Sequence, residues 1–338
     1  MNVAFLANSF HLSKTKSANF FIDLLQESFG NVAVIPNKDA WLEIPKKTWD
    51  LIVVWQHRYP PKELEAFGAK NIVLVPMYDD TPLDREFWEQ YRAFKVFCFS
   101  STIEKRLIAY GLSAWGSQYF PDSTLWPQVD WSHGLRAFFW PRTRKIDWKV
   151  VQRLIGDTAF EHIHIHWTPD VHGDVPSPIS EAAKRSGSIE VSSWFRDAQD
   201  YRTALARSNV FFASRVAEGI GMSFLEAMAM GLCVVAPNAP TMNEYIQNGV
   251  NGLLYDPENP KPLDFSRAHE LGKAARLSVQ KGRDAWTASK KEIVSFLSEP
   301  APGYVAKFHP LIIAKGRGIS FARKIYRFLK QKLKDKKA

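Results

Sequence analysis

The stretch from Ser214 to Pro257, SRVAEGIGMSFLEAMAMGLCVVAPNAPTMNEYIQNGVNGLLYDP, carries the strongest fold signal in the chain. The apolar run NVFFAS before its glycine loop predicts a strand, MSFLEAMAMG predicts a helix ended by Gly231, and LCVVAP predicts a second strand. This order of elements places a phosphate against free backbone N–H groups at the helix N-terminus. Two acids, Glu218 and Glu226, lie around the glycine loop with seven residues between them. One precedes the helix and one lies in its first turns, so both are expected to face one crevice.

This stretch resembles the retaining, nucleotide-sugar-dependent glycosyltransferases of the GT-B fold, the group 1 family or family 4. The family pattern, EGFG-x-x-x-x-EAMA-x-G-x-PVVA, is matched here by EGIGMSFLEAMAMG and then CVVA. The family continues with an acid and an NGLL-type turn, matched by Asn243-Glu244-Tyr245 and Asn251-Gly252-Leu253-Leu254. The resemblance spans roughly 45 contiguous residues, far more than a lone glycine motif. It implies an α/β protein with two Rossmann-like doubly wound domains that face a central crevice.

Length and composition agree with two domains. The chain has 338 residues, of which 46% are hydrophobic, enough for two cores of roughly 150 residues each. A loop rich in Pro, Asp, Trp and Ser, Pro121 to Gly134, predicts the domain boundary. We therefore expect an acceptor-binding domain over 1–128, a nucleotide-sugar-binding domain over 129–300 and a basic tail over 301–338.

Apolar runs separated by helical patterns favour a doubly wound α/β architecture in both domains. In the first domain the runs predict six strands: Val3–Ala7, Val32–Ile35, Leu51–Trp55, Ile72–Pro76, Val96–Phe99 and Gln118–Phe120. Two separate helices, near Asp264–Gln280 and Gly282–Leu297, are expected to close the second domain.

Several protein classes are disfavoured by what the sequence lacks. No G-x-G-x-x-G follows the first strand, which argues against a dinucleotide-dependent dehydrogenase. The two cysteines, Cys98 and Cys233, lie in strands that are predicted to be buried, as is typical of packing residues in a reducing compartment. The start, MNVAFLANSF, lacks a signal-peptide pattern, and no apolar run reaches the roughly 18 residues of a spanning helix. The expected location is cytoplasmic.

Fixed cations are expected to stabilise the leaving diphosphate, without a metal or other cofactor. The family carries an Arg and a Lys in a GR…KG pattern after the first strand of its second domain, and Arg142 and Lys145 match them. Pro141 stands where Gly is usual and the loop is shorter, so Arg144 is an alternative partner. An Arg fork suits phosphate because it donates two parallel hydrogen bonds. A solvated turn is the other interpretation.

The resemblance also assigns the donor contacts. The amides of Gly221, Met222 and Ser223 match the turn that touches phosphate and sugar hydroxyls. Glu226 matches the acid that accepts from the ribose hydroxyls, and Glu218 the acid set against the donor sugar. Thr168 follows a strand that ends at the nucleotide site in the family. The later acidic motif matches less well, because Ala239-Pro240 replaces a usual Gly-Gly.

The acceptor side is less well marked. Tyr78-Asp79 stands where the family often has His-Asp. His57 follows the end of a strand, where α/β sheets place ligands, and an exposed aromatic of the segment from Trp55 to Pro60 could stack on a sugar. Lys14, in the loop after the first strand, also points to the crevice on this topology.

Two patterns suggest a metal. His162, His164 and His166 alternate, so a strand puts all three on one face. They would converge poorly on one ion, and histidines packed at the sheet are the preferred interpretation. Asp79-Asp80 is an acid pair whose adjacent side chains diverge. No metal site is therefore expected.

The charge is concentrated at the C-terminus. The segment from Lys315 to Lys337 has ten basic residues and one acid, Asp335, so its net charge equals the +9 of the whole chain. Five apolar residues follow helical spacing among them: Phe321, Ile325, Phe328, Leu329 and Leu333. Such a helix can dock on the protein, bind nucleic acid or bind an anionic membrane surface. Peripheral association with the inner membrane face is expected, because it fits a lipid-linked acceptor.

The sequence therefore predicts a metal-independent glycosyltransferase. It moves a sugar from a nucleotide-diphosphate donor to a hydroxyl of a glycan or lipid-linked glycan, of surface polysaccharide or lipopolysaccharide type, and binds no nucleic acid. The alternative is a non-catalytic, degenerate transferase that holds a glycan or a membrane. Intact Glu218, Glu226 and Gly221 disfavour that alternative, and the altered Gly-Gly and His-Asp positions favour it. The base, the sugar and the acceptor are not encoded in these motifs.

Overall fold

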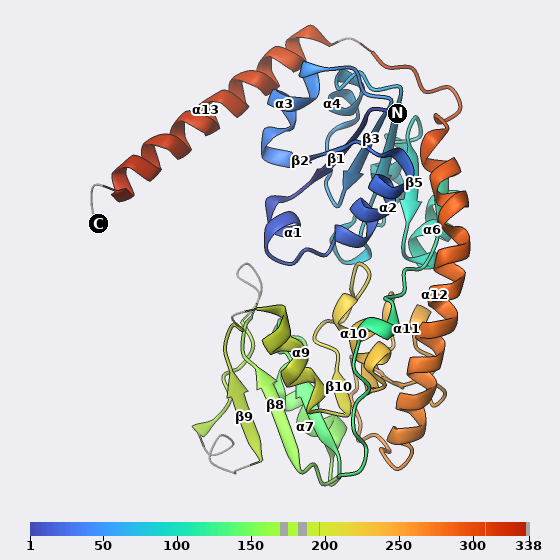
Figure 1. Ribbon diagram of the computed structural model, residues 1–338, viewed down its shortest axis with the longest axis vertical. Helices are drawn as coiled ribbons and strands as arrows, with labels where there is room; N and C mark the ends of the chain where they lie inside the picture. Colours follow the sequence, from blue (N-terminus) through green and yellow to red (C-terminus); the bar gives the residue numbers. More distant parts are fainter. Residues whose placement is uncertain (170–174, 182–187, 196, 308, 336–338) are drawn as a thin grey trace. The chain divides into compact units, whose positions relative to one another are not determined.

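The chain folds into two compact units, seen in a computed structural model that describes residues 1–169, 175–181, 188–195, 197–307 and 309–335 (Figure 1). Unit 1 comprises Met1–Ser117 and Ser289–Ala338, and unit 2 comprises Gln118–Ala288. Each is built around one six-stranded sheet in which all the pairings are parallel. The expected α/β class with two doubly wound domains is therefore confirmed.

The sheet of unit 1 has the strand order β2-β1-β3-β4-β5-β6. Its central strands are buried end to end, which explains why they read as continuous apolar runs in the sequence. The strands are β1 (Val3–Ala7), β2 (Val32–Pro36), β3 (Leu51–Trp55), β4 (Asn71–Val75), β5 (Lys95–Cys98) and β6 (Ser113–Gly116).

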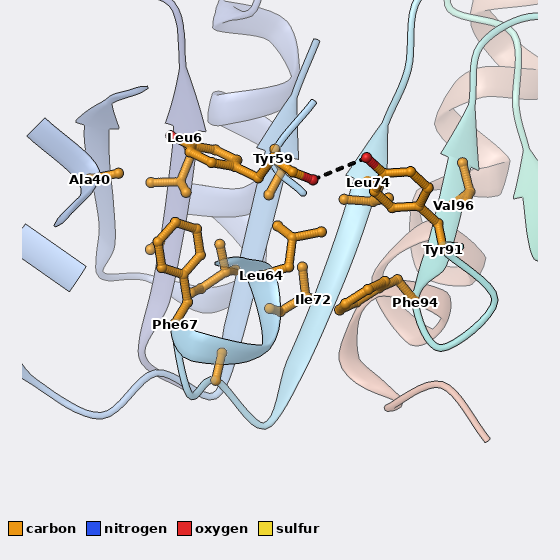
Figure 2. Packing of buried hydrophobic residues seen from close by; sticks show 14 of the residues in the cluster. Leu6, Ala40, Tyr59, Leu64, Phe67, Ile72, Leu74, Tyr91, Phe94 and Val96 are labelled. Carbon is orange, nitrogen blue, oxygen red and sulfur yellow. Dashed lines mark hydrogen bonds between the residues drawn. The ribbon is translucent and has the colours of Figure 1, made fainter. Parts of the chain in front are cut away.

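Helices on unit 1 enclose a hydrophobic core. Figure 2 shows part of it, where Leu6, Leu74 and Val96 from the strands meet Phe67 and Phe94, and the Tyr91 hydroxyl donates to the Tyr59 carbonyl at 3.1 Å. The helices are α1 (Ser9–Ser13), α2 (Asn19–Phe29), α3 (Ala40–Glu43), α4 (Pro61–Ala66), α5 (Arg85–Glu89), α6 (Ser101–Ala109) and α13 (Pro310–Asp335); short 3-10 turns are η1 (Asn37–Asp39), η2 (Ile44–Lys46) and η3 (Tyr78–Asp80).

The sheet of unit 2 has the order β12-β11-β10-β7-β8-β9. Its strands are β7 (Arg136–Phe139), β8 (His162–His166), β9 (Ile189–Ser192), β10 (Val210–Phe212), β11 (Cys233–Pro237) and β12 (Leu253–Tyr255). Its helices are α7 (Trp148–Ile155), α9 (Ala198–Ala206), α10 (Met222–Met230) and α11 (Met242–Tyr245), with the 3-10 turn η4 (Ser123–Leu125). A long helix, α12 (Ala268–Ser298), follows β12. Cys98 and Cys233 are both buried, as expected, and neither forms a disulfide bond.

Two element predictions are wrong. The sixth strand is Ser113–Gly116 and not Gln118–Phe120, because this short, half-buried edge strand, SAWG, gives no apolar run. The two expected closing helices are one continuous helix, α12. Gly282 lies inside this helix and does not end it. A Cβ at this position would lie 2.5 Å from the Phe120 ring, so the glycine allows the ring to pack closely against the helix.

The unit boundary also differs from the expected one. It lies after Ser117, not after residue 128, and residues 289–300 group with unit 1. The end of α12 is tied to that sheet because Asn71 donates to the Leu297 carbonyl at 2.7 Å, and the buried Lys95 donates to the Phe296 carbonyl. These two polar side chains satisfy carbonyls that the helix end leaves without intrahelical partners.

The first half of α13 packs on unit 1. Ile312 and Ile313 contact the core, and a Cβ at Gly316 would lie 2.3 Å from the Trp41 indole. The exposed side chains of this helix include Leu311, Phe321 and Ile325. None of the helices in the described part of the chain is long and apolar enough to cross a membrane.

Candidate functional site

The topology of unit 2 marks one place for a ligand. Strands β7 and β10 are neighbours in the sheet, and the chain proceeds outward from them in opposite directions. Open α/β sheets bind ligands outside the carboxyl ends of the strands at such a switch point. The loop after β7 carries Arg142, and the loop after β10 carries Glu218 and Gly221. The two sequence motifs therefore leave the sheet at the same point.

The glycine loop ends at the N-terminus of α10, where the N-cap residue has no side chain that could cap the helix. Gly221 is the N-cap residue, with φ +82°, and a Cβ there would lie 1.9 Å from the Phe224 ring. Only glycine fits this left-handed, crowded position. The first amides of α10, from Met222 onward, are the groups that an anion bound at this helix N-terminus would meet, and their contact with the donor stays a prediction.

Glu218 is held by a residue that the sequence did not reveal. The Thr241 hydroxyl, which is fully buried, donates to the Glu218 backbone carbonyl at 2.7 Å. Thr241 follows the Ala239-Pro240 pair that replaces the usual Gly-Gly. The loop after β11 thus fixes the backbone that carries the first acid of the motif.

Glu226 lies on α10 in a partly buried setting. Burial raises its pKa from 4.5 to about 7, while the Arg202 charge and the Tyr201 hydroxyl act to lower it. Both residues come from α9, and Arg202 also stacks over the Trp126 ring at 4.6 Å. The Tyr201 hydroxyl faces the Glu226 carboxylate, but it makes no hydrogen bond of ordinary geometry to any described residue. The carboxylate is therefore under-solvated and could accept hydrogen bonds from a ligand.

Arg142 lies over an aromatic platform. Its guanidinium is 4.6 Å from the centre of the Trp140 ring, and the Trp140 indole donates to the Thr168 carbonyl at 3.0 Å. His166, the last residue of β8, packs edge-on against Trp140, and burial is the main cause that lowers its pKa to about 4. The Thr168 hydroxyl is buried and has no partner among the described residues. Arg142, Thr168 and His166 therefore meet at one edge.

The other two cations of this loop are placed less specifically. Arg144 and Lys145 are both exposed, in the turn before the helix α7. Asp147 ends that turn, since its side chain accepts from the amides of Lys149 and Val150. Arg142 is thus the half-buried cation of the three, and roles for Arg144 and Lys145 stay predictions.

The residues predicted for the acceptor side lie along the carboxyl edge of the unit 1 sheet. Lys14, His57 and Tyr78-Asp79 follow the carboxyl ends of β1, β3 and β4, which are adjacent in the sheet. Trp55 and Tyr59 are both buried in the core, so neither is an exposed aromatic that could stack on a sugar. Gln56 has φ +47°, a strained conformation for a residue with a side chain, at the point where β3 ends.

Three polar residues of this edge were not predicted as site residues. Arg58 pairs with Asp80 at 3.1 Å, and Asp80 acts electrostatically on both His11 and His57. Desolvation is the main cause that lowers the pKa of each imidazole, and Asp80 opposes it. The sequence paired Asp79 with Tyr78, but the fold brings Asp80 near His11 of α1 and His57 of the loop after β3.

The alternating histidines share one sheet face, as predicted. His164 and His166 both lie within hydrogen-bonding distance of the Ser192 hydroxyl, at 2.8 and 3.0 Å. Among the described residues, the one group with metal-ligand spacing is His162, His164 and Glu190, and Asp79-Asp80 is not part of it.

Residues 148–268 match the family described as Glycosyl transferases group 1. A curated relative, a sucrose synthase of Melioribacter roseus, is 33% identical over 108 residues. That match covers 28% of this chain and 14% of the relative. The matched family region includes Glu218, Glu226 and Thr241, and it begins after the Arg142 loop.

Solved structures share the two-domain fold. The Anabaena protein Alr3699/HepE, in complex with UDP, has a TM-score of 0.62 at 15% identity, covering 88% of this chain and 100% of its own. A sucrose-phosphate synthase from Thermosynechococcus elongatus has a TM-score of 0.62 at 13% identity, covering 87% and 98%. At these identities the likeness establishes the GT-B fold.

Proposed function

Because this chain carries a glycosyl transferases group 1 region within a GT-B fold, we propose that it transfers a sugar from a nucleotide-diphosphate donor to a hydroxyl of a glycan or lipid-linked glycan, with retention at the anomeric carbon. The observation that carries the proposal is the switch point of unit 2. There a half-buried arginine, a helix N-terminus with glycine at the N-cap position and an under-solvated glutamate follow neighbouring strands. Crystals of a fold neighbour contain UDP and glucose, which makes UDP-glucose the first donor to test.

In this proposal each group of the site contacts one part of the donor. The α10 amides and Arg142 hold the diphosphate, Glu226 accepts from the ribose hydroxyls, and Glu218 orients the sugar. As the diphosphate leaves, the bond from the anomeric carbon to the phosphate oxygen breaks and the acceptor oxygen bonds to that carbon on the same face. The leaving phosphate oxygen takes the acceptor proton. The fixed donors stabilise the charge that develops on the diphosphate.

We expect transfer to survive metal removal. The proposed charge stabilisation comes from Arg142 and the α10 N-terminus, so no divalent ion is needed for the chemistry. The measurement is the initial transfer rate from UDP-glucose, or from the donor found in a panel of UDP, GDP, ADP and dTDP sugars, with and without EDTA. A rate abolished by EDTA and restored by Mg²⁺ or Mn²⁺ would contradict this proposal.

The same assay separates an enzyme from a non-catalytic binding protein. An active transferase turns over its donor, by transfer to an acceptor or by slow hydrolysis to free sugar and nucleotide. A degenerate transferase binds nucleotide sugar or glycan and leaves the donor intact. Absence of both transfer and hydrolysis, in protein that binds a nucleotide sugar, would exclude catalysis.

Thr241→Val tests whether the backbone at Glu218 must be fixed. The substitution keeps the shape of the side chain and removes the donor to the Glu218 carbonyl, 2.7 Å away. We expect kcat to fall about tenfold, the equivalent of roughly 1.4 kcal/mol, with nucleotide affinity within about twofold. Thr241→Ser restores the donor and should recover most of kcat. An unchanged kcat in a folded Thr241→Val protein would show that this hydrogen bond does not position the site.

The basic helix α13 bears on the acceptor and on the location of the protein. We propose that α13 holds the protein peripherally on an anionic membrane surface, where a lipid-linked surface-polysaccharide or lipopolysaccharide precursor would be presented. The basic residues of the tail supply attraction to anionic headgroups, each worth about 1 kcal/mol near the surface. Phe321 and Ile325 are exposed and apolar, so both could insert between headgroups.

The tail is best tested by substitution, because truncation at Gly316 would uncover Trp41. We expect the double variant Phe321→Asp/Ile325→Asp to lose co-sedimentation with anionic vesicles by at least about tenfold, since burying one such side chain is worth roughly 1.5–3 kcal/mol. Wild type should bind anionic vesicles, ignore neutral ones and dissociate in high salt.

Leu277→Asp is the matched control. Leu277 is an exposed leucine of α12 in unit 2, so its variant should bind vesicles as wild type does. Transfer to a soluble acceptor analogue should be unchanged in all three proteins. Vesicle binding that persists in the double variant would show that these α13 side chains do not contact the membrane.

A further inference from the structure

One face of the strands β8 and β9 gathers three metal-ligating side chains. His162 and His164 are two residues apart on β8, and His164 pairs in register with Glu190 of β9. The ligand atoms of all three lie within 4.8 Å of one another. The His164 side chain is only 4% exposed, whereas those of His162 and Glu190 are 31% and 46% exposed, so the group opens to solvent on one side.

The spacing of these atoms is close to that of a tetrahedral site. The Nε2 atom of His162 is 3.3 Å from the Oε2 atom of Glu190, and the Nδ1 atom of His164 is 3.5 Å from that same oxygen. Zinc binds nitrogen and oxygen ligands at about 2.0–2.2 Å, so two ligands of a tetrahedron are about 3.3–3.5 Å apart. Two of the three distances between ligand atoms therefore already match those of a tetrahedral zinc site.

A hydrogen bond sets the orientation of the buried ligand. The Ser192 hydroxyl lies 2.8 Å from the Nε2 atom of His164. When Nε2 carries the proton and donates to Ser192, the Nδ1 lone pair faces Glu190. Metal-bound histidines almost always donate their other ring N–H in this way. The Ser192 hydroxyl is then free to donate to the Nδ1 atom of His166, which lies 3.0 Å away.

We propose that His162, His164 and Glu190 bind one Zn²⁺ ion, with a fourth position open to water or to another ligand. The two imidazoles and one carboxylate are a ligand set that zinc accepts. The ion would join the edge strand β9 to β8, because its ligands come from both strands.

This site lies apart from the proposed transfer chemistry. His162 is the first residue of β8, and Thr168 lies six residues further on, beyond the carboxyl end of the strand. The strand from His162 to His166 spans about 13 Å, and the chain turns after His166. The proposed zinc is therefore an ion of the strand edge, and the transfer assay in EDTA and the binding assay below can fail independently.

The alternative is a plain ion pair between Glu190 and a protonated histidine. An ion pair needs a charged imidazole, and charging the buried His164 side chain is costly. The two interpretations differ in what they require of a divalent cation. A metal site binds one Zn²⁺ per chain, and an ion pair binds none.

The test is titration of the metal-free full-length protein with Zn²⁺ by calorimetry and with Co²⁺ by visible absorption. We expect one equivalent of each, with the intense absorption of tetrahedral Co²⁺. An excess of Zn²⁺ of about 100 times Kd should raise the Tm by roughly 5–10 °C. Glu190→Gln and His162→Gln should each weaken Zn²⁺ binding at least tenfold, and Ser192→Ala by about tenfold.

His133→Gln is the matched control, because His133 and Asp130 form an exposed histidine–carboxylate pair, 3.8 Å apart, without a third ligand among the described residues. This variant should bind Zn²⁺ as wild type does. The Tm of each variant in EDTA shows that it is folded. Absence of stoichiometric binding in wild type, or wild-type affinity in folded Glu190→Gln and His162→Gln, would overturn the proposal.

Discussion

Replacing Arg142 by alanine is expected to lower kcat/KM for sugar transfer by about 100- to 1,000-fold, the usual effect of removing one preorganised donor at a developing negative charge. The half-buried guanidinium stacks on Trp140 at 4.6 Å, so the fork is oriented before the donor arrives. Arg142→Lys should recover only part of the loss, because an ammonium group cannot make two parallel hydrogen bonds. Steady-state kinetics with varied donor concentration measures the effect.

Arg153→Ala provides the comparison for Arg142→Ala. Arg153 is an exposed arginine of α7 in the same unit, outside the switch-point loops, so its variant should retain wild-type kinetics. Arg144→Ala decides which cation of the short loop is used. A larger loss from Arg144→Ala than from Arg142→Ala would move the diphosphate contact to Arg144.

Glu226→Gln has the second largest expected effect. Loss of the charged acceptor should weaken nucleotide binding by roughly 1–3 kcal/mol, or about 5- to 150-fold. Calorimetry with the nucleoside diphosphate measures this directly. Glu258→Gln, at an exposed glutamate of the same unit, is the control and should bind as wild type does. Equal affinities of Glu226→Gln and wild type would remove the ribose role from Glu226.

The raised pKa of Glu226 gives this prediction a pH dependence. Ionised Glu226 is the better acceptor, so nucleotide affinity should rise with pH through about 7. Stability runs the other way. The pKa of Glu226 is 4.5 in the unfolded chain and about 7 in the folded protein, so the folded protein binds the proton more tightly. This contribution to the free energy of unfolding is fully present below pH 4.5 and is lost as the pH rises to about 7.

Unfolding experiments test the stability side of this prediction. Without ligand at pH 8, Glu226→Gln should be more stable than wild type by at most about 3 kcal/mol, because one pKa unit corresponds to about 1.4 kcal/mol. The gain should vanish below pH 4.5, the usual pKa of a glutamate side chain. A Glu226→Gln protein that is less stable than wild type at pH 8 would show that ionised Glu226 is well paired in the fold.

The sequence predicted most of the sheet positions because the strands are buried on both faces and read as apolar runs. It also located the helix after the glycine loop, where Gly221 and Gly231 both have positive φ. It failed where tertiary packing decides the structure. Gly282 looked like a helix break, but it is the contact point for the Phe120 ring inside α12.

The candidate site was only partly readable for the same reason. Glu218 and Glu226 lie in a contiguous motif, so their spacing in the sequence is visible. Thr241 contacts the Glu218 backbone and Arg202 acts on Glu226, and both residues belong to other segments of the chain. No local sequence pattern predicts such contacts. Glu190 was missed likewise, since the alternation of His162 and His164 is visible on one strand and the carboxylate belongs to the neighbouring one.

The proposed function requires that a nucleotide sugar binds at the carboxyl edge of the unit 2 sheet. Hydrogen exchange of the wild-type protein, with and without saturating UDP or the diphosphate preferred in the panel, tests this most directly. We expect new protection at the first amides of α10, Met222 to Phe224, and in the loop 140–146. Protection confined to the loops after β1, β3 and β4 of unit 1, or no protection with any nucleoside diphosphate, would contradict it.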